Sequence, residues 1–293
     1  MNRLSLLHPA LYVLLCLIWG TTWMAIKVGL RDAPPFWSAA LRFIIAVTIL
    51  MVINAIRRSE YPRGWRNKLR VAWPGLFTYF GSYTLTYVGS VYITSALASI
   101  LFAVMPFFVM LLMVFMIKDE RVSWRSLLGV GIGFAGVVLI FAEPVSYSEN
   151  ALVGMVLLLL SPLAAAVGTV SIRAYLKDEP VLPMVTIQMA LGAILLTATA
   201  FIVEDFALFH FTADSVGALL FLAIFGSVIA FSVYYWLLQR IKLMTMSLIA
   251  LITPAVAMVA GYIFLNEILT PTDYFGAVLI LGGVAVVNLQ GKK

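Results

Sequence analysis

Long apolar runs separated by short polar breaks cover almost the whole chain. A transmembrane α-helix needs about 20 apolar residues to cross the hydrocarbon core of a bilayer, and each run is close to that length. The pattern therefore predicts an all-α integral membrane protein with ten transmembrane helices. The predicted spans are residues 9–29, 36–56, 71–91, 94–117, 124–142, 151–172, 183–203, 215–238, 244–265 and 272–289.

The amino-acid composition supports this prediction. The chain of 293 residues is 63% hydrophobic and 11% charged, whereas soluble domains are about 45–50% apolar and about 25% charged. The formal net charge of +6 is better explained by basic residues that orient a membrane protein than by nucleic-acid binding. The expected partners are therefore the lipid bilayer and a small-molecule substrate, with no nucleic acid, and a monomer is compatible with the pattern.

Lysine and arginine residues are distributed unequally between alternate loops. Nearly all of the 19 fall on the side that holds the N-terminus, and Arg31 alone lies in a loop on the other side. Cytoplasmic loops of membrane proteins carry an excess of Lys and Arg. The distribution predicts that both termini are cytoplasmic.

The chain also contains an internal repeat of about five spans. Residues 95–141 and 247–289 share a proline in mid-span, a glutamate where that span ends, and glycines at matched spacing after it. These residues are Pro106, Glu120, Gly129 and Gly136 in the first copy, and Pro254, Glu267, Gly276 and Gly283 in the second. Because five is odd, the second copy must cross the membrane in the opposite direction, as in the inverted repeats of secondary transporters. The predicted halves are residues 1–146 and residues 147–293.

Earlier in the two halves, Phe80-Gly81 corresponds to Phe225-Gly226. The glycines of the fifth and tenth spans allow two helices to approach closely. We therefore expect these two spans to form a scaffold or a subunit contact, and not the substrate site.

Short motifs add a family resemblance to this pattern. They are Trp19-Gly-Thr-Thr-Trp23 in the first span, Leu41-Arg42-Phe43 in the second, and the mid-span proline followed by a glutamate in each half. With these motifs the chain resembles the EamA branch of the drug/metabolite transporter superfamily, and within it the bacterial amino-acid exporters of the YddG type. The resemblance implies a multi-pass protein of the bacterial inner membrane that exports aromatic and other apolar amino acids.

The mid-span prolines are the first candidates for a substrate site. A proline inside a helix has no N–H to donate and clashes with the carbonyl four residues earlier. Pro106 and Pro254 should therefore each kink a span and expose a carbonyl, which must face protein or water. We expect both kinks to line a cavity at the membrane midplane; kinks that serve packing alone are the alternative.

Aromatic residues near the span centres are the second group of candidates. Trp and Tyr normally collect at membrane interfaces, yet two sets lie near the middle of spans at a four-residue spacing that places each set on one helix face. These sets are Trp19 and Trp23, and Tyr79, Tyr83 and Tyr87. We expect them to line the cavity, with aromatic packing between helices as the alternative. By contrast, Tyr234, Tyr235 and Trp236 lie near the end of a span, and we expect them at the interface.

Polar residues within the spans complete the candidate site. Hydroxyl groups could hydrogen-bond a zwitterion, although most such groups in membranes bond their own helix; the candidates are Ser99, Ser161, Thr169, Ser227 and Thr253. Lys27 and Arg42 are expected to snorkel toward the outer surface, with a substrate carboxylate at the outer mouth as the alternative for Lys27. All Asp and Glu residues lie in loops or at span ends, which argues against a carboxylate proton relay.

Three classes of function can be compared on these features. A carrier that alternates access to a central site fits the repeat, the prolines and the central aromatic residues. An enzyme is disfavoured, because His8 and His210 lie near span edges, no HExxH motif occurs and Cys16 is the single cysteine, so no metal or cofactor is expected. A channel-like pore would need a filter of carbonyls or charges, which the sequence does not show. The sequence therefore predicts an exporter by alternating access, with another amphipathic metabolite or drug as the alternative substrate.

Overall fold

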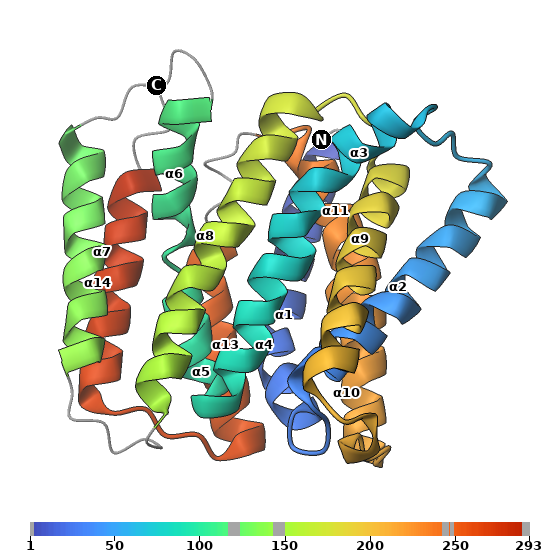
Figure 1. Cartoon of the computed structure of the whole chain (residues 1–293). Coiled ribbons are helices and arrows are strands. Elements are labelled where there is room, and N and C mark those ends of the chain that lie inside the picture. The colour runs from blue at the N-terminus through green and yellow to red at the C-terminus, as the bar shows by residue number, and fades with distance from the viewer. Residues whose placement is uncertain (1–2, 117–123, 143–149, 242–245, 247–248, 289–293) are drawn as a thin grey trace.

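The computed structural model describes residues 3–116, 124–142, 150–241, 246 and 249–288, and the described part is helical with no strand (Figure 1). Besides the α-helices, the chain contains two π-helical segments, η1 and η3, and one 3-10 helix, η2. The elements are α1 (Arg3–Gly29), α2 (Pro35–Arg57), α3 (Trp65–Gly75), η1 (Leu76–Ser82), α4 (Tyr83–Tyr92), α5 (Ser95–Phe102), α6 (Met105–Met116), α7 (Trp124–Ala142), α8 (Ala151–Tyr175), α9 (Val181–Val203), η2 (Phe206–Leu208), α10 (Ala213–Ala223), η3 (Ile224–Ile229), α11 (Ala230–Leu238), α13 (Ile249–Leu265) and α14 (Pro271–Asn288).

The helices have the length and composition of membrane spans. Six helical segments are long and apolar enough to cross a bilayer: His8–Gly29, Pro35–Arg57, Ser95–Met116, Ala151–Tyr175, Val181–Val203 and Ala213–Leu238. Three further apolar helices are shorter, at Leu127–Ile140, Ile252–Leu265 and Pro271–Val286. The predicted span at 71–91 coincides with α3, η1 and α4, which follow one another without a gap. The chain is a multi-pass membrane protein.

The two mid-span prolines have different effects on their helices. Between α5 and α6 the chain makes a tight turn ahead of Pro106, in which Phe107 N donates to Val104 O at 2.9 Å. This interruption is the consequence expected of a proline that cannot donate its own hydrogen bond. By contrast, α13 runs through Pro254 from Ile249 to Leu265. Glu120, which the repeat pairs with Glu267, lies outside the described residues.

The two Phe-Gly pairs that the predicted repeat matches both lie in π-helical segments. Phe80-Gly81 lies in η1 and Phe225-Gly226 in η3, and a serine follows each pair, Ser82 or Ser227. A π-helical turn widens the backbone hydrogen-bond ladder and is frequent at functional sites. Both residue pairs that the predicted repeat matches therefore lie in π-helical segments.

Helices α7 and α14 pack against each other at one edge of the bundle, at the left of Figure 1. A Cβ atom added at Gly136 would lie 2.6 Å from the carbonyl oxygen of Gly276, and one added at Gly283 would lie 2.3 Å from that of Gly129. Only glycine permits this separation. The glycines of the fifth and tenth predicted spans therefore pack two helices of one chain, as the scaffold interpretation requires.

Carboxylates cap two helices at the end of the bundle where α1 ends. Glu204, after α9, accepts from the backbone N–H groups of Phe36 and Trp37 at the start of α2, both at 2.9 Å. Glu267, after α13, accepts from the N–H groups of Ser95 at 2.8 Å and Ala96 at 3.1 Å at the start of α5. These acids satisfy donors that have no partner within their own helix.

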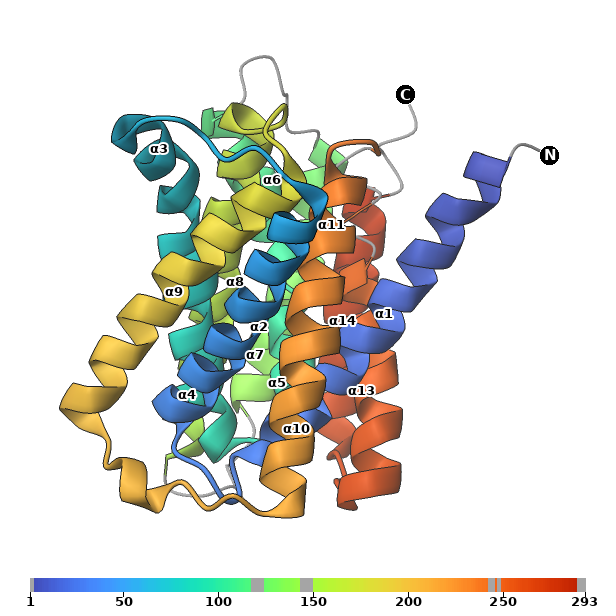
Figure 2. The same cartoon turned by 90° about the vertical axis from the view of Figure 1, so that its right-hand side faces the viewer.

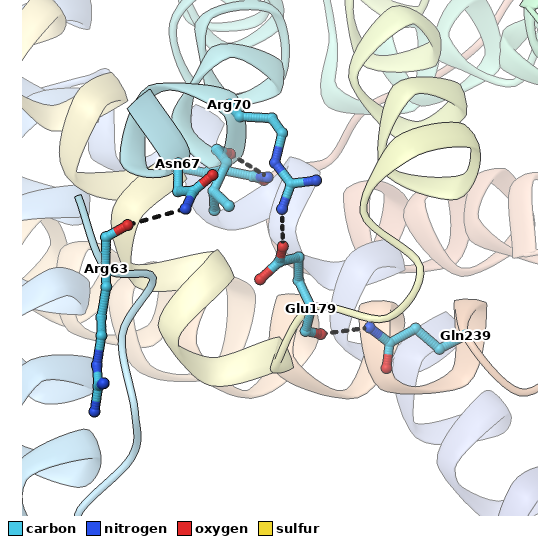
Figure 3. A network of polar contacts seen from close by, with 7 residues as sticks. Arg63, Asn67, Arg70, Glu179 and Gln239 are labelled. Carbon is cyan, nitrogen blue, oxygen red and sulfur yellow. Dashed lines mark hydrogen bonds and ion pairs between the residues drawn. The ribbon is translucent and has the colours of Figure 1, made fainter. Parts of the chain in front are cut away.

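A second polar network joins helix ends at the opposite end of the bundle (Figure 3). The Arg70 guanidinium of α3 forms an ion pair with Glu179, in the connection between α8 and α9. Gln239, directly after α11, donates to the Glu179 carbonyl at 2.9 Å. Figure 2 shows the bundle from the side, with α2 running beside α9 and the start of α1 extending away from the other helices.

Candidate functional site

A cavity of about 140 Å³ lies among the helices of the bundle. Its lining residues come from α1, α2, η1, α4, α5, α6, α8, α11 and α13, together with Ser82 at the end of η1 and Met246. Neither α7 nor α14 contributes a lining residue. Helices of both predicted halves therefore surround one space, and the glycine-packed pair stands apart from it.

Half of the predicted site residues line this cavity. They are Trp19, Trp23, Tyr83, Pro106, Thr169 and Thr253. The remaining candidates lie elsewhere. Tyr79 and Tyr87 are buried beside Tyr83 but do not reach the cavity, and Pro254 is buried within α13.

Three serines of the predicted site bond other protein groups. Ser99 Oγ donates to the carbonyl of Ala96 in its own helix, at 2.6 Å. Ser161 Oγ lies 2.8 Å from Ser82 Oγ and 2.7 Å from Thr86 Oγ1, and so links α8 to η1 and α4. Ser227 Oγ donates to Leu222 O at 2.9 Å. The hydroxyl-bearing residues that line the cavity are instead Ser82 and five threonines: Thr22, Thr78, Thr86, Thr169 and Thr253.

Aromatic rings form one wall of the cavity. The Trp19 ring lies 4.9 Å from Tyr234 and 5.6 Å from Phe231, measured between centroids. Trp23 lies 5.4 Å from Phe102, the last residue before the interruption at Pro106. These are the separations of favourable aromatic pairs, so the wall is a packed cluster that also gives the cavity an apolar surface.

Two tyrosines expected at the membrane interface belong to this wall instead. Tyr234 and Tyr235 line the cavity, and Tyr235 is 1% exposed. The interfacial prediction was wrong for both, because α11 turns this face toward α1 and η1. Trp236, on another face of α11, stacks with Arg240, whose Cζ lies 4.1 Å above the indole ring.

Arg42 is the charged residue among the described residues that line the cavity. Its side chain is 1% exposed, and Nε donates to Ser227 Oγ at 2.8 Å while Nη2 donates to Gly226 O at 3.1 Å. Its Nη1 and Nη2 also donate to the hydroxyls of Tyr87 and Tyr83, each at 3.3 Å. The snorkelling prediction was therefore wrong for Arg42, because α2 directs this side chain to α4 and η3 and not to the surface.

Lys27 lies outside the cavity and caps a helix. Its Nζ donates to the carbonyls of Ser90 at 2.9 Å, Val91 at 3.2 Å and Ile93 at 2.8 Å, where α4 ends. An ammonium group has three donors, and a cation is favourable at the C-terminus of a helix. In this arrangement Lys27 has no donor left for a substrate.

The sequence contained features that could have identified the cavity residues that the prediction missed. Arg42 is a charge within an apolar run, which in membrane proteins is functional by default, and its position close to the span end led to the wrong prediction. Phe231, Tyr234 and Tyr235 lie at spacings of three and four residues on one helix, a spacing that shares a face. Hydropathy did not show whether that face meets lipid, headgroups or other helices.

A cavity lined mostly by apolar side chains and a few polar groups has the features of a small-molecule binding site. The chain belongs to the EamA-like transporter family, whose model matches residues 9–142 and again residues 152–289. The family description and the names of the relatives are those of transporters, so the chain is a small-molecule transporter.

Related proteins match this chain over nearly its full length. An uncharacterized transporter from Archaeoglobus fulgidus is 30% identical over 92% of this chain and 94% of its own. A probable amino-acid metabolite efflux pump from Salmonella typhimurium is 25% identical over 97% of this chain and 95% of its own. A crystal structure with 20% sequence identity has a TM-score of 0.71 and covers 98% of both chains, so the overall fold is shared.

Proposed function

We propose that this transporter exports small metabolites, in particular aromatic and other apolar amino acids, from the bacterial cytoplasm across the inner membrane. The observation that carries the proposal is a cavity lining that combines aromatic rings with hydroxyl-bearing residues and the Arg42 guanidinium. Such a mostly apolar site with a few polar groups suits an apolar side chain joined to a charged head group.

The size of the cavity supports ligands that carry one ring or a branched aliphatic group. The volume is about 140 Å³, and an apolar cavity of about 150 Å³ in another protein accepts benzene. The name of the Salmonella relative, which refers to an amino-acid metabolite, points to the same class.

The proposed mechanism is alternating access by two inverted five-helix halves, residues 1–146 and 147–293, which together form ten transmembrane helices. Three features support it: the two matches of the family model, the equal lengths of α2 and α9, each of 23 residues, and the π-helical segments in corresponding helices. Substrate would bind between the halves, as in other inverted-repeat carriers.

Transport in this mechanism needs no proton carried by the protein. Within the described residues no Asp or Glu lines the cavity, and the capping acids Glu204 and Glu267 are engaged at helix ends. Substrate should therefore move down its own gradient in either direction, and export follows from a higher concentration in the cytoplasm.

The test is flux in liposomes that contain the purified protein. We expect saturable movement of labelled phenylalanine and leucine down their gradients, with no accumulation when a pH step is imposed. Trp19→Ala should reduce the flux, whereas Trp124→Ala, at an exposed tryptophan of α7 outside the cavity, should not. Flux that does not saturate would favour a pore, and failure of every amino acid to move would contradict this substrate class.

A further inference from the structure

The guanidinium of Arg42 is a buried cation whose hydrogen-bond partners are all neutral. Its acceptors are two tyrosine hydroxyls, one serine hydroxyl and one backbone carbonyl. Arg70 pairs with Glu179 at the end of the bundle, whereas no carboxylate among the described residues forms an ion pair with Arg42. Neutral acceptors satisfy N–H groups but leave the charge uncompensated, and a buried charge without a counterion is unfavourable.

The two edges of this guanidinium are held differently. Ser227 and Gly226, both in η3, bind Nε at 2.8 Å and Nη2 at 3.1 Å and fix one edge. The other edge, formed by Nη1 and Nη2, meets Tyr87 and Tyr83 at 3.3 Å, slightly longer than the 2.7–3.2 Å that is usual for such bonds. A carboxylate would form shorter, charge-assisted and bidentate bonds to this edge.

The position of Arg42 joins the charge to the aromatic wall. Its Cζ lies 4.8 Å from the centroid of the Tyr83 ring. Tyr83 lies 6.3 Å from Phe231, and Phe231 lies 5.6 Å from Trp19. A ligand whose carboxylate binds Arg42 could therefore place its side chain against these rings without leaving the cavity.

The cavity offers no comparable partner for an ammonium group. Apart from Arg42, its polar lining consists of hydroxyl and aromatic side chains, and no carboxylate from the described part of the chain reaches it. The fixed charge within the site is thus positive, which favours a ligand with a net negative charge over a zwitterion and disfavours a cation.

We propose that Arg42 binds the carboxylate of the substrate, and that the site requires the carboxylate but not the α-amino group. The substrate class is then apolar carboxylates, aromatic ones in particular, with amino acids as members that carry a dispensable amine. This inference rests on the proposed function, since it concerns how the same cavity selects its ligand.

Competition experiments with the wild-type protein in proteoliposomes test whether the site requires the carboxylate or the amino group of its ligand. Labelled phenylalanine is the reporter, and the competitors are 3-phenylpropanoate, which keeps the carboxylate, and 2-phenylethylamine, which keeps the amine. We expect 3-phenylpropanoate to compete at least as well as unlabelled phenylalanine, and 2-phenylethylamine to be weaker by about tenfold or more. Stronger competition by the amine would overturn the inference.

Substitutions then test the residue. Arg42→Gln should weaken both phenylalanine flux and competition by 3-phenylpropanoate, and Arg42→Lys, which keeps the charge but not the bidentate geometry, should retain part of both. Arg240→Gln is the matched control, because Arg240 stacks on Trp236 outside the cavity. Undiminished competition by 3-phenylpropanoate in a folded Arg42→Gln protein would overturn the assignment of Arg42. If that variant does not fold, the competition experiment with the wild-type protein tests the inference.

A binding measurement separates this inference from the proposed function. Thermal unfolding of the wild-type protein in detergent should be shifted upward by 3-phenylpropanoate and not by 2-phenylethylamine, because a ligand that binds the native state stabilises it. If no amino acid is transported but this shift occurs, the proposed function fails and the inference holds. If phenylalanine is transported and only the amine stabilises the protein, the inference fails and the proposed function holds.

Discussion

Whether a residue of this protein lines the cavity depends on which helices its side chain faces, and not on how close it lies to the end of a span. Arg42 and Tyr235 both lie toward a span end in the sequence, yet each is 1% exposed and lines the cavity. Polar atoms that are removed from water need partners within the protein, and the Ser227 hydroxyl and the Gly226 carbonyl supply them for Arg42. Both side chains are therefore held inside the bundle as part of the cavity lining.

Aromatic residues of the cavity should determine which substrates are preferred. Tyr83→Ala and Tyr235→Ala each remove a ring from the wall and should change the ratio of phenylalanine flux to leucine flux, because in the proposed site these rings contact the substrate side chain. Tyr262→Ala is the control, since Tyr262 is 67% exposed on α13 and lies outside the cavity. The flux ratio in liposomes is the measurement. An unchanged ratio in both cavity variants would show that these rings serve packing alone.

At the scale of elements, helix contacts and helix ends depend on single small or acidic residues. The α7–α14 pair is held at a backbone separation that only glycine permits, and carboxylates from other segments cap α2 and α5. The glycine spacing was readable from the sequence. The caps were not, since the acid and the helix that it caps lie more than 150 residues apart.

Adjacent glycines of α14 provide a matched test of the packing. A Cβ at Gly283 would lie 2.3 Å from the oxygen of Gly129, whereas one at Gly282 would meet no atom within 4 Å. Gly283→Ala should therefore lower the free energy of unfolding by about 1–3 kcal/mol. Gly282→Ala should leave it unchanged or raise it slightly, because alanine favours a helix. Unfolding in detergent measures both, and equal stabilities would contradict the close packing.

The carboxylate cap of α5 has a measurable contribution to stability. Glu267→Gln removes the negative charge that accepts from Ser95 N and Ala96 N and should cost about 1–2 kcal/mol, since a charged acceptor at a helix N-terminus is favourable. Asp214→Asn, at an exposed acid in the first turn of α10, should cost only a few tenths of a kcal/mol. The same unfolding assay compares them, and a larger loss for Asp214→Asn would refute the capping role.

At the scale of the whole molecule, the direction in which the chain crosses the membrane remains a prediction. Glu204 binds the start of α2, so the connection after α9 and the connection after α2 lie at opposite ends of the bundle. Because basic residues are concentrated in the loop after α2, that end should face the cytoplasm.

Single cysteines test the orientation in a background that lacks Cys16. Ala207→Cys, in the connection after α9, should react with a membrane-impermeant thiol reagent in intact cells. Ser59→Cys, after α2, should react only when the membrane is permeabilised. The reverse pattern would contradict the proposed topology, because the loop after α2 would then face the outside of the cell.

The sequence by itself determined the membrane environment, the helical class and the family, because the length of an apolar run and the signs of its flanking charges are local properties. It also located Trp19, Trp23 and Tyr83, whose four-residue spacing defines a helix face. Only the tertiary structure decided that Tyr234, Tyr235 and Arg42 line the cavity while Tyr79, Tyr87 and Ser161 are buried outside its lining. The physical reason is that lipid and the interior of a helical bundle are similarly apolar, so hydropathy shows that a segment leaves water but not which of its faces meets another helix.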